Sequence, residues 1–386
     1  MKISSIETRV VGAQTPGSVL SDRNYVFVLV HTDEGLTGLG EATLEGHDRS
    51  VRAAIEEMAD LVVGEDPTRI EYLTQVMTRQ MFWRGGVIKG TAVAGVELAL
   101  WDIVGKSAGL PVHQLVGGAV RDRIRVYTNG WSAGSTDPVE LRDRAQAAVA
   151  AGHRAFKFSL VLPSWPLRDA ELLRSVATAA AAVREAVGPE APLMFDGHGR
   201  YDADQAIAIG RVLEDVRVYF YEEPVQPGRL GDMARVAQAL DLTIAAGERL
   251  ASKEEFVPLL SNGAVSVVQP DLAHCHGFGE GMKIAQLADA FGAWIAPHGP
   301  MSPVLTAIST HLDAVAPNFL IQERLHLDDW RENVIRTPLK VEDGFLPLPT
   351  GPGWGIELDD EICSAHPRVS VQVPRLFRAD SSVADW

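Results

Sequence analysis

Three carboxylates recur at regular spacing in the middle of the sequence. Asp196 lies in FDGHGR, Glu222 in YFYEEP and Glu248 in IAAGERL, each about 26 residues after the one before. Each closes a short apolar run typical of a buried strand. On consecutive parallel strands they would meet at one edge of the sheet, where carboxylates repel each other unless a cation lies between them. A single such residue is commonly a helix cap or a solvated charge, but three in matching context predict a metal site, and all-oxygen ligands favour Mg²⁺.

The elements that must position these residues alternate regularly from Ile124 onward. The strand candidates are 124–129, 155–160, 192–198, 218–224, 242–248, 265–272, 293–299 and 318–324. Helical periodicity is evident between several of them, at 169–188, 202–216, 278–292 and 302–315. Eight strands alternating with helices predict an α/β fold, a (β/α)₇β TIM-like barrel whose reactive groups lie at the carboxyl ends of the strands. A doubly wound sheet is the alternative, but no glycine-rich phosphate loop follows the first strand.

The two chain ends have a different pattern. Residues 1–118 contain strand-like runs joined by a DEG turn, then helical segments at 50–64 and 89–109, which indicates an α+β capping domain. We expect the barrel domain at 119–324. Residues 325–386 would complete the cap, with a turn and short strand at 351–360 and a mostly extended tail from 364.

Composition narrows the class of partner. With 386 residues, 46% of them hydrophobic, the chain is large enough to form the cores of a barrel and of a smaller domain. Its formal charge of −16 disfavours nucleic acid and anionic membranes as partners, because both would repel it. The two cysteines, Cys275 and Cys363, indicate no disulfide framework. The sequence shows no signal-peptide pattern and no run of about 18 apolar residues that would span a membrane. We therefore expect a cytoplasmic protein that acts on a small molecule.

Several further motifs occur in the order found in one known family. They are ELALWDIVGKSAGLPVHQLVGG, the series D…EEP…GER, QPDLAH, APHGP and IQE. Together they resemble the enolase superfamily, and within it the mandelate racemase subgroup, over roughly residues 1–360. The resemblance implies a barrel capped by both chain ends, one bound Mg²⁺, and an enediolate formed from a carboxylate substrate. Within the subgroup the pattern is similar to the galactonate dehydratases and related sugar-acid dehydratases.

One departure from the subgroup bears on the reaction. Racemases of the subgroup carry Lys-x-Lys at the end of the second barrel strand, where this chain has Lys157 followed by Phe158 and Ser159. The second Lys, a base, is therefore absent, which disfavours a two-base racemase. The His198 position, two residues after the first metal Asp, matches the sugar-acid dehydratases. Lys157 is expected to add positive charge beside the substrate carboxylate, and a Lys extending from the barrel rim is its structural alternative.

The resemblance also implies an acid and a base. His298 in APHGP is the expected general base, oriented by Asp271 of QPDL. His198 is expected to protonate the departing 3-hydroxyl, or else only to bind a sugar hydroxyl. Glu323 is expected to hold a proton near the developing oxyanion, which requires that burial raise its pKa; a structural ion pair is the alternative.

Substrate specificity is expected to come from the cap and the strand-end loops. The candidates are Asp22, Arg23, Glu45, His47, Trp83, Arg84, Asn129 and Trp131. His274 and His276 flank Cys275, but this set is incomplete for a metal site, so loop or substrate contacts are the expected role. A symmetric homo-oligomer is also expected from the resemblance.

The favoured function is a Mg²⁺-dependent aldonate dehydratase that gives a 2-keto-3-deoxy acid, with galactonate or a related hexonate as substrate. Two alternatives stay open at this point. One is a racemase, epimerase or cycloisomerase of the same superfamily. The other is a catalytically idle sugar-acid-binding regulatory protein.

Overall fold

Eight parallel strands form the centre of the molecule in the computed structural model, which describes residues 1–13, 23–327, 329–371 and 375–385. The strands are β4 (Arg123–Asn129), β5 (Phe156–Phe158), β6 (Leu193–Asp196), β7 (Phe220–Glu222), β8 (Ile244–Ala246), β9 (Val267–Val268), β10 (Trp294–Ile295) and β11 (Gln322–Leu325). They follow the order β10-β9-β8-β7-β6-β5-β4-β11, and a parallel bridge between Ile295 and Phe319 closes the ring. All eight predicted strands are present, and the predicted barrel is confirmed.

One layer of buried hydrophobic side chains lies inside the barrel, below the carboxyl ends of the strands. Each strand region contributes one buried residue to this cluster: Tyr127, Ala155, Met194, Phe220, Ala245, Val267, Ala296 and Ile321. Large and small side chains share the layer, as a closed barrel requires. Side chains alternate along a strand, so residues two positions further along point to the same side as this layer.

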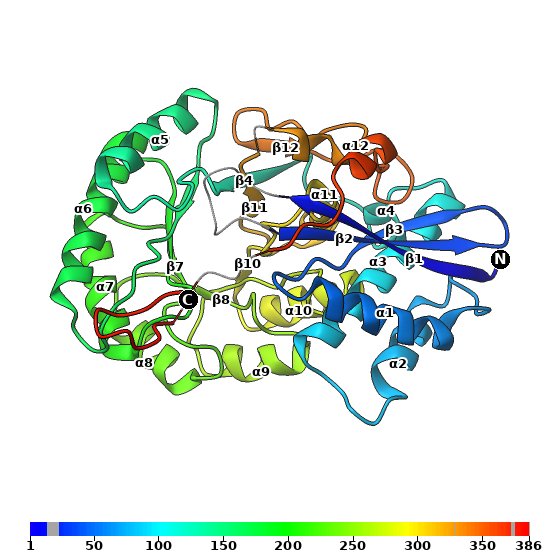
Figure 1. Ribbon diagram of the computed structural model, residues 1–386, viewed down its shortest axis with the longest axis horizontal. Coiled ribbons are helices and arrows are strands. Elements are labelled where there is room, and N and C mark those ends of the chain that lie inside the picture. The colour runs from blue at the N-terminus through cyan, green and yellow to red at the C-terminus, as the bar shows by residue number, and fades with distance from the viewer. Residues whose placement is uncertain (14–22, 328, 372–374, 386) are drawn as a thin grey trace.

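Seven helices connect the barrel strands and cover the sheet, giving the (β/α)₇β order (Figure 1). They are α5 (Pro138–Ala150), α6 (Ala170–Val187), α7 (Ala203–Asp215), α8 (Leu230–Ala239), α9 (Lys253–Ser261), α10 (Phe278–Ala290) and α11 (Pro303–Val315). The sequence pattern did not predict α5, α8 and α9. The last two are short, and Pro258 interrupts the pattern of α9, whereas Asp137 followed by Pro138 is a helix-start signal that could have located α5.

The N-terminal part forms the expected α+β unit. Strands β1 (Ile3–Ala13), β2 (Arg23–Thr32) and β3 (Thr37–Glu41) make an antiparallel sheet, packed against α1 (Asp48–Val62) and α3 (Val87–Ala108). Helices α2 (Ile70–Arg79) and α4 (Val112–Leu115) pack against α3. Helix α2 was not predicted. Helix α3 is buried on most of its circumference, because it lies between the cap sheet and the barrel.

The C-terminal part returns to the cap and then crosses to the barrel helices (Figure 1). It contains η1 (Trp330–Val334), β12 (Phe345–Pro347), which pairs with β4, and α12 (Asp360–Ala365), which contacts β1. The predicted short strand at 351–360 is wrong: Gly353 and Gly355 have positive φ, so only isolated bridges form there. The tail predicted from 364 also begins inside α12.

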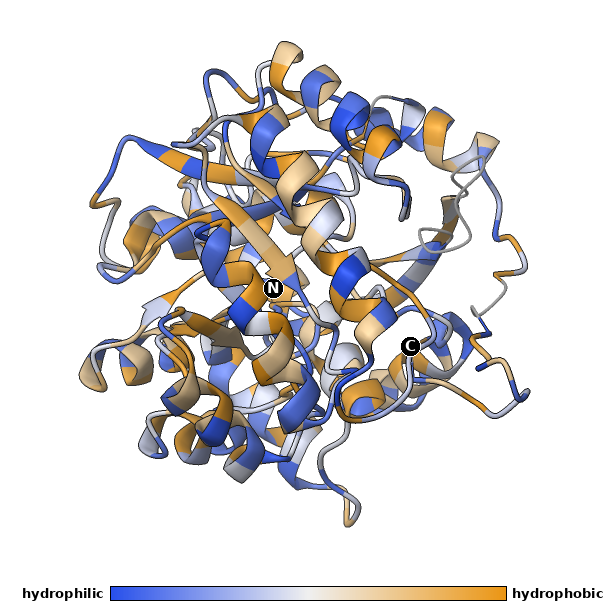
Figure 2. Cartoon of the chain, turned by 90° about the vertical axis from the view of Figure 1, so that its left-hand side faces the viewer, coloured by the Kyte–Doolittle hydropathy of each residue, from blue (hydrophilic) through white to orange (hydrophobic). Residues whose placement is uncertain are grey.

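The outer helices alternate hydrophilic and hydrophobic residues (Figure 2). In helix α6, for example, Leu172, Val176, Ala179 and Val183 are buried and repeat at helical spacing. None of the helices in the described part of the chain has the length and apolar character needed to cross a membrane.

A buried carboxylate joins the cap to the barrel. Glu97 of α3 accepts hydrogen bonds from the backbone nitrogens of Phe278 and Gly279 and from the indole of Trp101, each at 2.8 Å. Burial raises the pKa of Glu97 to about 7, although all three donors oppose the shift. The bonds tie α3 to the start of α10.

Glu97→Gln is expected to lower the free energy of unfolding by about 2 kcal/mol. The glutamine NH₂ cannot accept a hydrogen bond, so it would leave the backbone N–H of Phe278 or of Gly279 without its acceptor. Urea denaturation of both proteins measures the difference. Glu56→Gln on the exposed face of α1 is the matched control and should change little. Equal stability of the two variants would contradict the bridging role of Glu97.

Candidate functional site

Asp196, Glu222 and Glu248 lie together at the carboxyl end of the barrel. One oxygen of each carboxylate lies within 4.8 Å of those of the other two. Asp196 and Glu222 are register partners on neighbouring strands. Glu248 reaches the cluster after Gly247, whose φ of 141° turns the chain out of β8. A Cβ at position 247 would lie 2.9 Å from the backbone nitrogen of Gln269, so this turn requires glycine.

The three carboxylates have strongly perturbed electrostatics. Burial raises the pKa of Glu222 well above its ordinary value, and the charge of Asp196 adds to the effect. Burial would also raise the pKa of Asp196, but His198 and Lys157 outweigh it and hold the pKa well below its usual range. Within the described residues, Oε2 of Glu222 is buried without a hydrogen-bond partner. The cluster therefore has an unsatisfied oxygen where a cation would be favourable.

Lys157 lies beside these carboxylates. Its Nζ is 2.8 Å from Glu222, 2.8 Å from Glu323 and 3.1 Å from Asp196. Burial would lower the pKa of Lys157, but the surrounding carboxylates raise it well above its ordinary value. The side chain is only 1% exposed, so it does not extend from the rim into solvent.

His298 and Asp271 form the expected pair on neighbouring strand ends. Nδ1 of His298 lies 2.6 Å from Oδ2 of Asp271, while its Nε2 faces Glu248 at 3.1 Å. Burial would lower the pKa of His298, but Glu248, Asp271 and Glu323 raise it to about 10. The imidazole thus has one nitrogen fixed by Asp271 and the other directed toward the carboxylate cluster.

His274 extends this pair. Its Nδ1 lies 3.5 Å from Oδ2 of Asp271, and its Nε2 lies 3.0 Å from the carbonyl oxygen of Thr43 in the cap. Asp271, His274 and His298 also present ligand atoms within 4.8 Å of one another. Because Asp271 already holds Nδ1 of His298, we interpret the three as a row of polar contacts rather than a second metal site.

Glu323 differs electrostatically from the expectation. Burial would raise its pKa, but Lys157 and His298 outweigh it and lower the pKa below the ordinary value. Its oxygens also accept hydrogen bonds from Asn129 at 2.9 Å and the backbone nitrogen of Gly299 at 3.0 Å. The predicted rise of the Glu323 pKa is therefore wrong: Lys157 and His298 favour the ionised carboxyl, which lies 2.8 Å from the ammonium group of Lys157.

His198 lies on the other side of the cluster. Its Nε2 is 3.2 Å from Oδ2 of Asp196, and its backbone nitrogen donates to Oδ1 of the same residue at 2.9 Å. The His198 backbone has a φ of 52°, in the left-handed region. Arg249 donates to the His198 carbonyl oxygen, and its Nε lies 3.4 Å from Glu248. These contacts fix a partly exposed imidazole, 25% accessible, beside the carboxylates.

Most of the groups described above border a cavity of about 500 Å³. Those that line it are Lys157, Asp196, Glu248, His298, His198 and His274, with Ser159 and Arg249. Glu222, Asp271 and Glu323 lie behind this lining. The cavity is therefore walled by acidic, basic and imidazole groups together.

The predicted substrate contacts divide into three sets. Arg23, Glu45 and Asn129 line the cavity. Four others lie elsewhere: His47, Trp83, Arg84 and Trp131. His47 is exposed at the start of α1, Trp83 is 84% exposed, and Arg84 borders a separate cavity. Trp131 is buried, and its indole donates to the carbonyl oxygen of Lys157. Asp22 lies outside the described residues.

Comparison with known proteins places the chain in a family. The family model for the mandelate racemase/muconate lactonizing enzyme N-terminal domain matches residues 5–117, and the enolase C-terminal domain-like model matches residues 140–362. The chain belongs to the mandelate racemase/muconate lactonizing enzyme family. This confirms the resemblance found in the sequence.

Family members with similar sequences share nearly the whole length. D-galactonate dehydratases of Verminephrobacter eiseniae and Xanthomonas oryzae pv. oryzae are each 37% identical to this chain, covering 94% of it and 96% of the relative. A mandelate racemase/muconate lactonizing enzyme from Sulfitobacter sp. has a solved structure with a TM-score of 0.91 and 33% identity, covering all of both chains. An enolase superfamily member from Salmonella Typhimurium superposes with a TM-score of 0.87 at 30% identity, covering 95% of this chain and 98% of that one.

Arg249, which lines this family member's cavity, was missed, whereas His274 was expected only as a loop or substrate contact, without its link to Asp271. Arg249 directly follows Glu248 in GERL, and His274 stands three residues after Asp271. The signal for both was proximity to a residue already singled out, since a short turn after a strand keeps its residues at the same edge of the barrel.

Proposed function

We propose that this protein is a Mg²⁺-dependent sugar-acid dehydratase whose substrate is galactonate or a stereoisomeric hexonate. The chain is an enzyme of the hydro-lyase class, related over almost its full length to galactonate dehydratases. One observation carries the proposal: a carboxylate cluster, a His–Asp pair and a second His border one cavity of about 500 Å³. That volume accommodates a small polar substrate.

The residues fit a hard divalent cation. Asp196, Glu222 and Glu248 would hold it, since all three offer oxygen and Oε2 of Glu222 is buried without a partner in the described part of the chain. When bound, Mg²⁺ would neutralise the second negative charge that develops on the substrate carboxylate when C2 is deprotonated.

Lys157 is proposed to bind the same substrate carboxylate. Its ammonium group is held at 2.8 Å by Glu222 and by Glu323, so it is oriented before the substrate arrives and needs no reorganisation during reaction. Glu323 is proposed to act through Lys157, because its pKa is lowered and a proton donor would need the opposite shift.

His298 is proposed to remove the proton from C2. Asp271 fixes Nδ1, so Nε2 is the nitrogen available to accept the proton. A base must be neutral, and the raised pKa of His298 depends on Glu248 at 3.1 Å. A cation shared by Glu248 would offset that attraction and lower the pKa toward neutrality.

His198 is proposed to protonate the 3-hydroxyl as it leaves as water. The C3–O bond breaks as electrons from the broken C2–H bond form the C2–C3 double bond. The resulting enol tautomerises to a 2-keto-3-deoxy acid, and protonated His298 can return its proton at C3. The cavity holds Ser159 where a second Lys base would be needed, which disfavours a two-base racemase.

A panel of aldonates incubated with the protein and Mg²⁺ tests the proposal. A 2-keto-3-deoxy acid is expected from galactonate or one of its stereoisomers, detected as a new α-keto acid. Absence of product from every sugar acid, with metal bound, would overturn the function. Exchange of C2–H for solvent deuterium without loss of water would indicate a racemase, epimerase or cycloisomerase instead.

His198→Asn should separate the two halves of the reaction. Without the acid, water loss is expected to slow by about a hundredfold or more, whereas His298 still exchanges the C2 proton. Product formation and C2 deuterium incorporation, measured on the same sample, give both rates. Equal losses in the two rates would mean that His198 only binds the substrate.

The proposed domain division follows the expected boundaries. Residues 1–118 would form the cap, 119–324 the barrel, and 325–386 the segment that completes the cap. The contacts between α12 and β1 and the pairing of β12 with β4 support a C-terminal segment shared by both units.

A homo-oligomer is likewise proposed, with sedimentation analysis as its test.

A further inference from the structure

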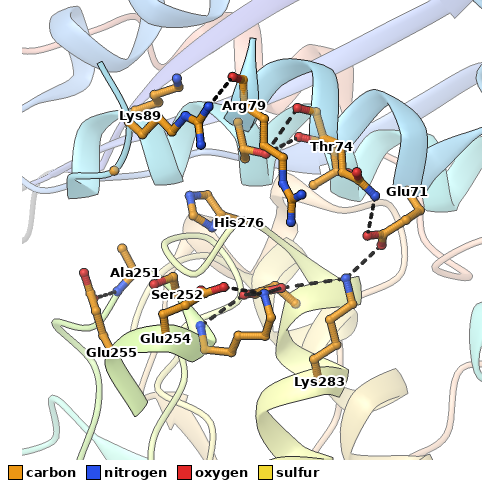
Figure 3. Close-up of a pocket in the computed structure, with 16 residues that line it drawn as sticks. Glu71, Thr74, Arg79, Lys89, Ala251, Ser252, Glu254, Glu255, His276 and Lys283 are labelled. Carbon is orange, nitrogen blue, oxygen red and sulfur yellow. Dashed lines mark hydrogen bonds and ion pairs between the residues drawn. The ribbon is translucent and has the colours of Figure 1, made fainter. Parts of the chain in front are cut away.

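A second cavity, of about 380 Å³, lies between the cap and the barrel. Helix α2 and the start of α3 form one wall, and the segments after β8 and β9, with α10, form the other. In Figure 3, Arg79 and Lys89 project from the first wall, Lys283 and Glu254 lie on the second, and the His276 ring stands between them. None of these residues has a role in the proposed reaction.

The charges of the two walls are unequal. On the barrel wall, Lys253 pairs with Glu254 at 3.0 Å, and Lys283 pairs across the cavity with Glu71 of α2 at 2.8 Å. Glu280 lies between these two lysines, 3.0 and 3.8 Å from their Nζ atoms. Two of the three carboxylates on this wall, Glu254 and Glu280, are therefore paired with lysines, while Glu255 accepts a hydrogen bond from the backbone nitrogen of Ala251 at 2.6 Å.

Three cations on the cap wall lack any such partner. Within the residues that the structure describes, Arg79, Arg84 and Lys89 form no ion pair with a carboxylate. Arg84 and Lys89 donate only to the backbone carbonyl oxygens of Arg79 and Trp83, at 3.0 and 3.1 Å. Burial and the charge of Arg84 lower the pKa of Lys89, which shows that the cations repel one another. In a chain with a net charge of −16, this local excess of positive charge is unusual.

His276 adds a further polar group. Its backbone φ of 67° is left-handed, and its ring forms no hydrogen bond with the other described residues. Burial lowers the pKa of His276, so near neutral pH the ring is uncharged and keeps one N–H donor. Guanidinium groups, an ammonium group and a neutral imidazole are a donor set that matches the oxygens of a phosphate group.

We propose that this cavity binds a phosphate group, either inorganic phosphate or the phosphate of a small metabolite. Arg79, Arg84 and Lys89 supply its charge-assisted hydrogen bonds. A carboxylate carries one negative charge and would balance only one of the three positive charges. The doubly charged phosphate is therefore the better match.

The cavity is connected to the active site through shared segments. Val87 lines the active-site cavity, while Arg84 and Lys89 on either side line the second one. Likewise, His274 faces the active site and His276 the second cavity. A bound phosphate would bridge cap and barrel through these segments and restrict their motion, so binding is expected to change the affinity for the sugar acid.

Packing makes this connection tight. A Cβ on Gly90 in the first turn of α3 would lie 2.6 Å from the carbonyl oxygen of His274. The helix start and the loop after β9 therefore touch through their backbones. Movement of one of them must displace the other.

Calorimetric titration of the Mg²⁺-loaded protein tests the site with two probes, inorganic phosphate and glycerol 3-phosphate, at constant ionic strength. The double variant Arg79→Gln/Lys89→Gln is expected to raise Kd by about tenfold or more, since two charge-assisted hydrogen bonds are lost. The matched control is Arg142→Gln, an exposed arginine on α5, which should bind like the unmodified protein. Single variants at Arg79 and Lys89, each expected to weaken binding, serve if the double variant does not fold.

Phosphate could instead bind the Mg²⁺ of the active site, and Asp196→Asn distinguishes the two sites. Binding that survives in Asp196→Asn and is lost in the double variant supports the second cavity. Tighter binding of inorganic phosphate identifies the free ion as ligand, and tighter binding of glycerol 3-phosphate identifies a phosphate ester. Binding that is lost in Asp196→Asn but retained in the double variant, or no binding of either probe, would overturn the proposal. None of these readouts depends on the dehydratase reaction.

Discussion

His298→Asn is expected to reduce kcat for the sugar acid by about a thousandfold or more, because the amide cannot accept the C2 proton. The side chain is similar in size and can still hydrogen-bond to Asp271, which lies 2.6 Å from the imidazole. The fold and Mg²⁺ binding should therefore be nearly unchanged. Steady-state kinetics at saturating Mg²⁺, with calorimetric metal titration, measures both quantities.

The same substitution at His31 is the matched control. His31 lies on β2 in the cap and hydrogen-bonds Thr37 at 2.9 Å, away from the cavity. Turnover of His31→Asn should equal that of the unmodified protein. Unchanged turnover in His298→Asn would refute its assignment as base.

Glu222→Gln is expected to weaken Mg²⁺ binding by about a hundredfold or more, and turnover should fall with it. The amide has the shape of the carboxyl but supplies only one oxygen and no charge. The substitution also removes an ion pair of Lys157, whose Nζ lies 2.8 Å from Oε1. Direct Mg²⁺ titration separates metal loss from a loss of turnover alone.

The neighbouring Glu223 provides a close control. It is also buried, but its carboxylate accepts a hydrogen bond from the backbone nitrogen of Gly247 at 3.0 Å. Glu223→Gln keeps that acceptor oxygen and should retain Mg²⁺ binding. If Glu222→Gln bound Mg²⁺ as well as Glu223→Gln, the proposed ligand set would be wrong.

Most of the barrel could be predicted because its strands are apolar runs of regular spacing. Several functional residues lie two positions after the interior residue of their strand, as Asp196 does after Met194 and Glu222 after Phe220. Side chains two positions apart on a strand point to the same side, so the strand that places one residue in the barrel interior also places the next such residue in the site. Helices α8 and α9 were missed because their apolar patterns are short or interrupted, and their positions are determined by packing against the sheet. Helix α5 was missed although Asp137 and Pro138 mark its start.

The electrostatics of the site could not be derived from the sequence. Whether the Glu323 pKa rises or falls depends on the distance to Lys157, which only the folded barrel determines. The same applies to specificity: Trp83 and Arg84 looked like Arg23 as candidates, yet only Arg23 lines the active-site cavity. Long-range geometry decides such cases, because residues in one loop can face different cavities.

The pairing of Asp196 with Glu222 across neighbouring strands has a consequence for how such a protein tolerates change. Lengthening or shortening helix α7 by a turn would leave the two carboxylates opposite each other, because hydrogen bonds between the strands, not the number of intervening residues, hold them there. Deleting one residue within β7 would instead turn Glu222 outward and direct Tyr221 toward the barrel axis. Length variation among descendants of this chain should therefore accumulate in the connecting helices and be absent from the strands.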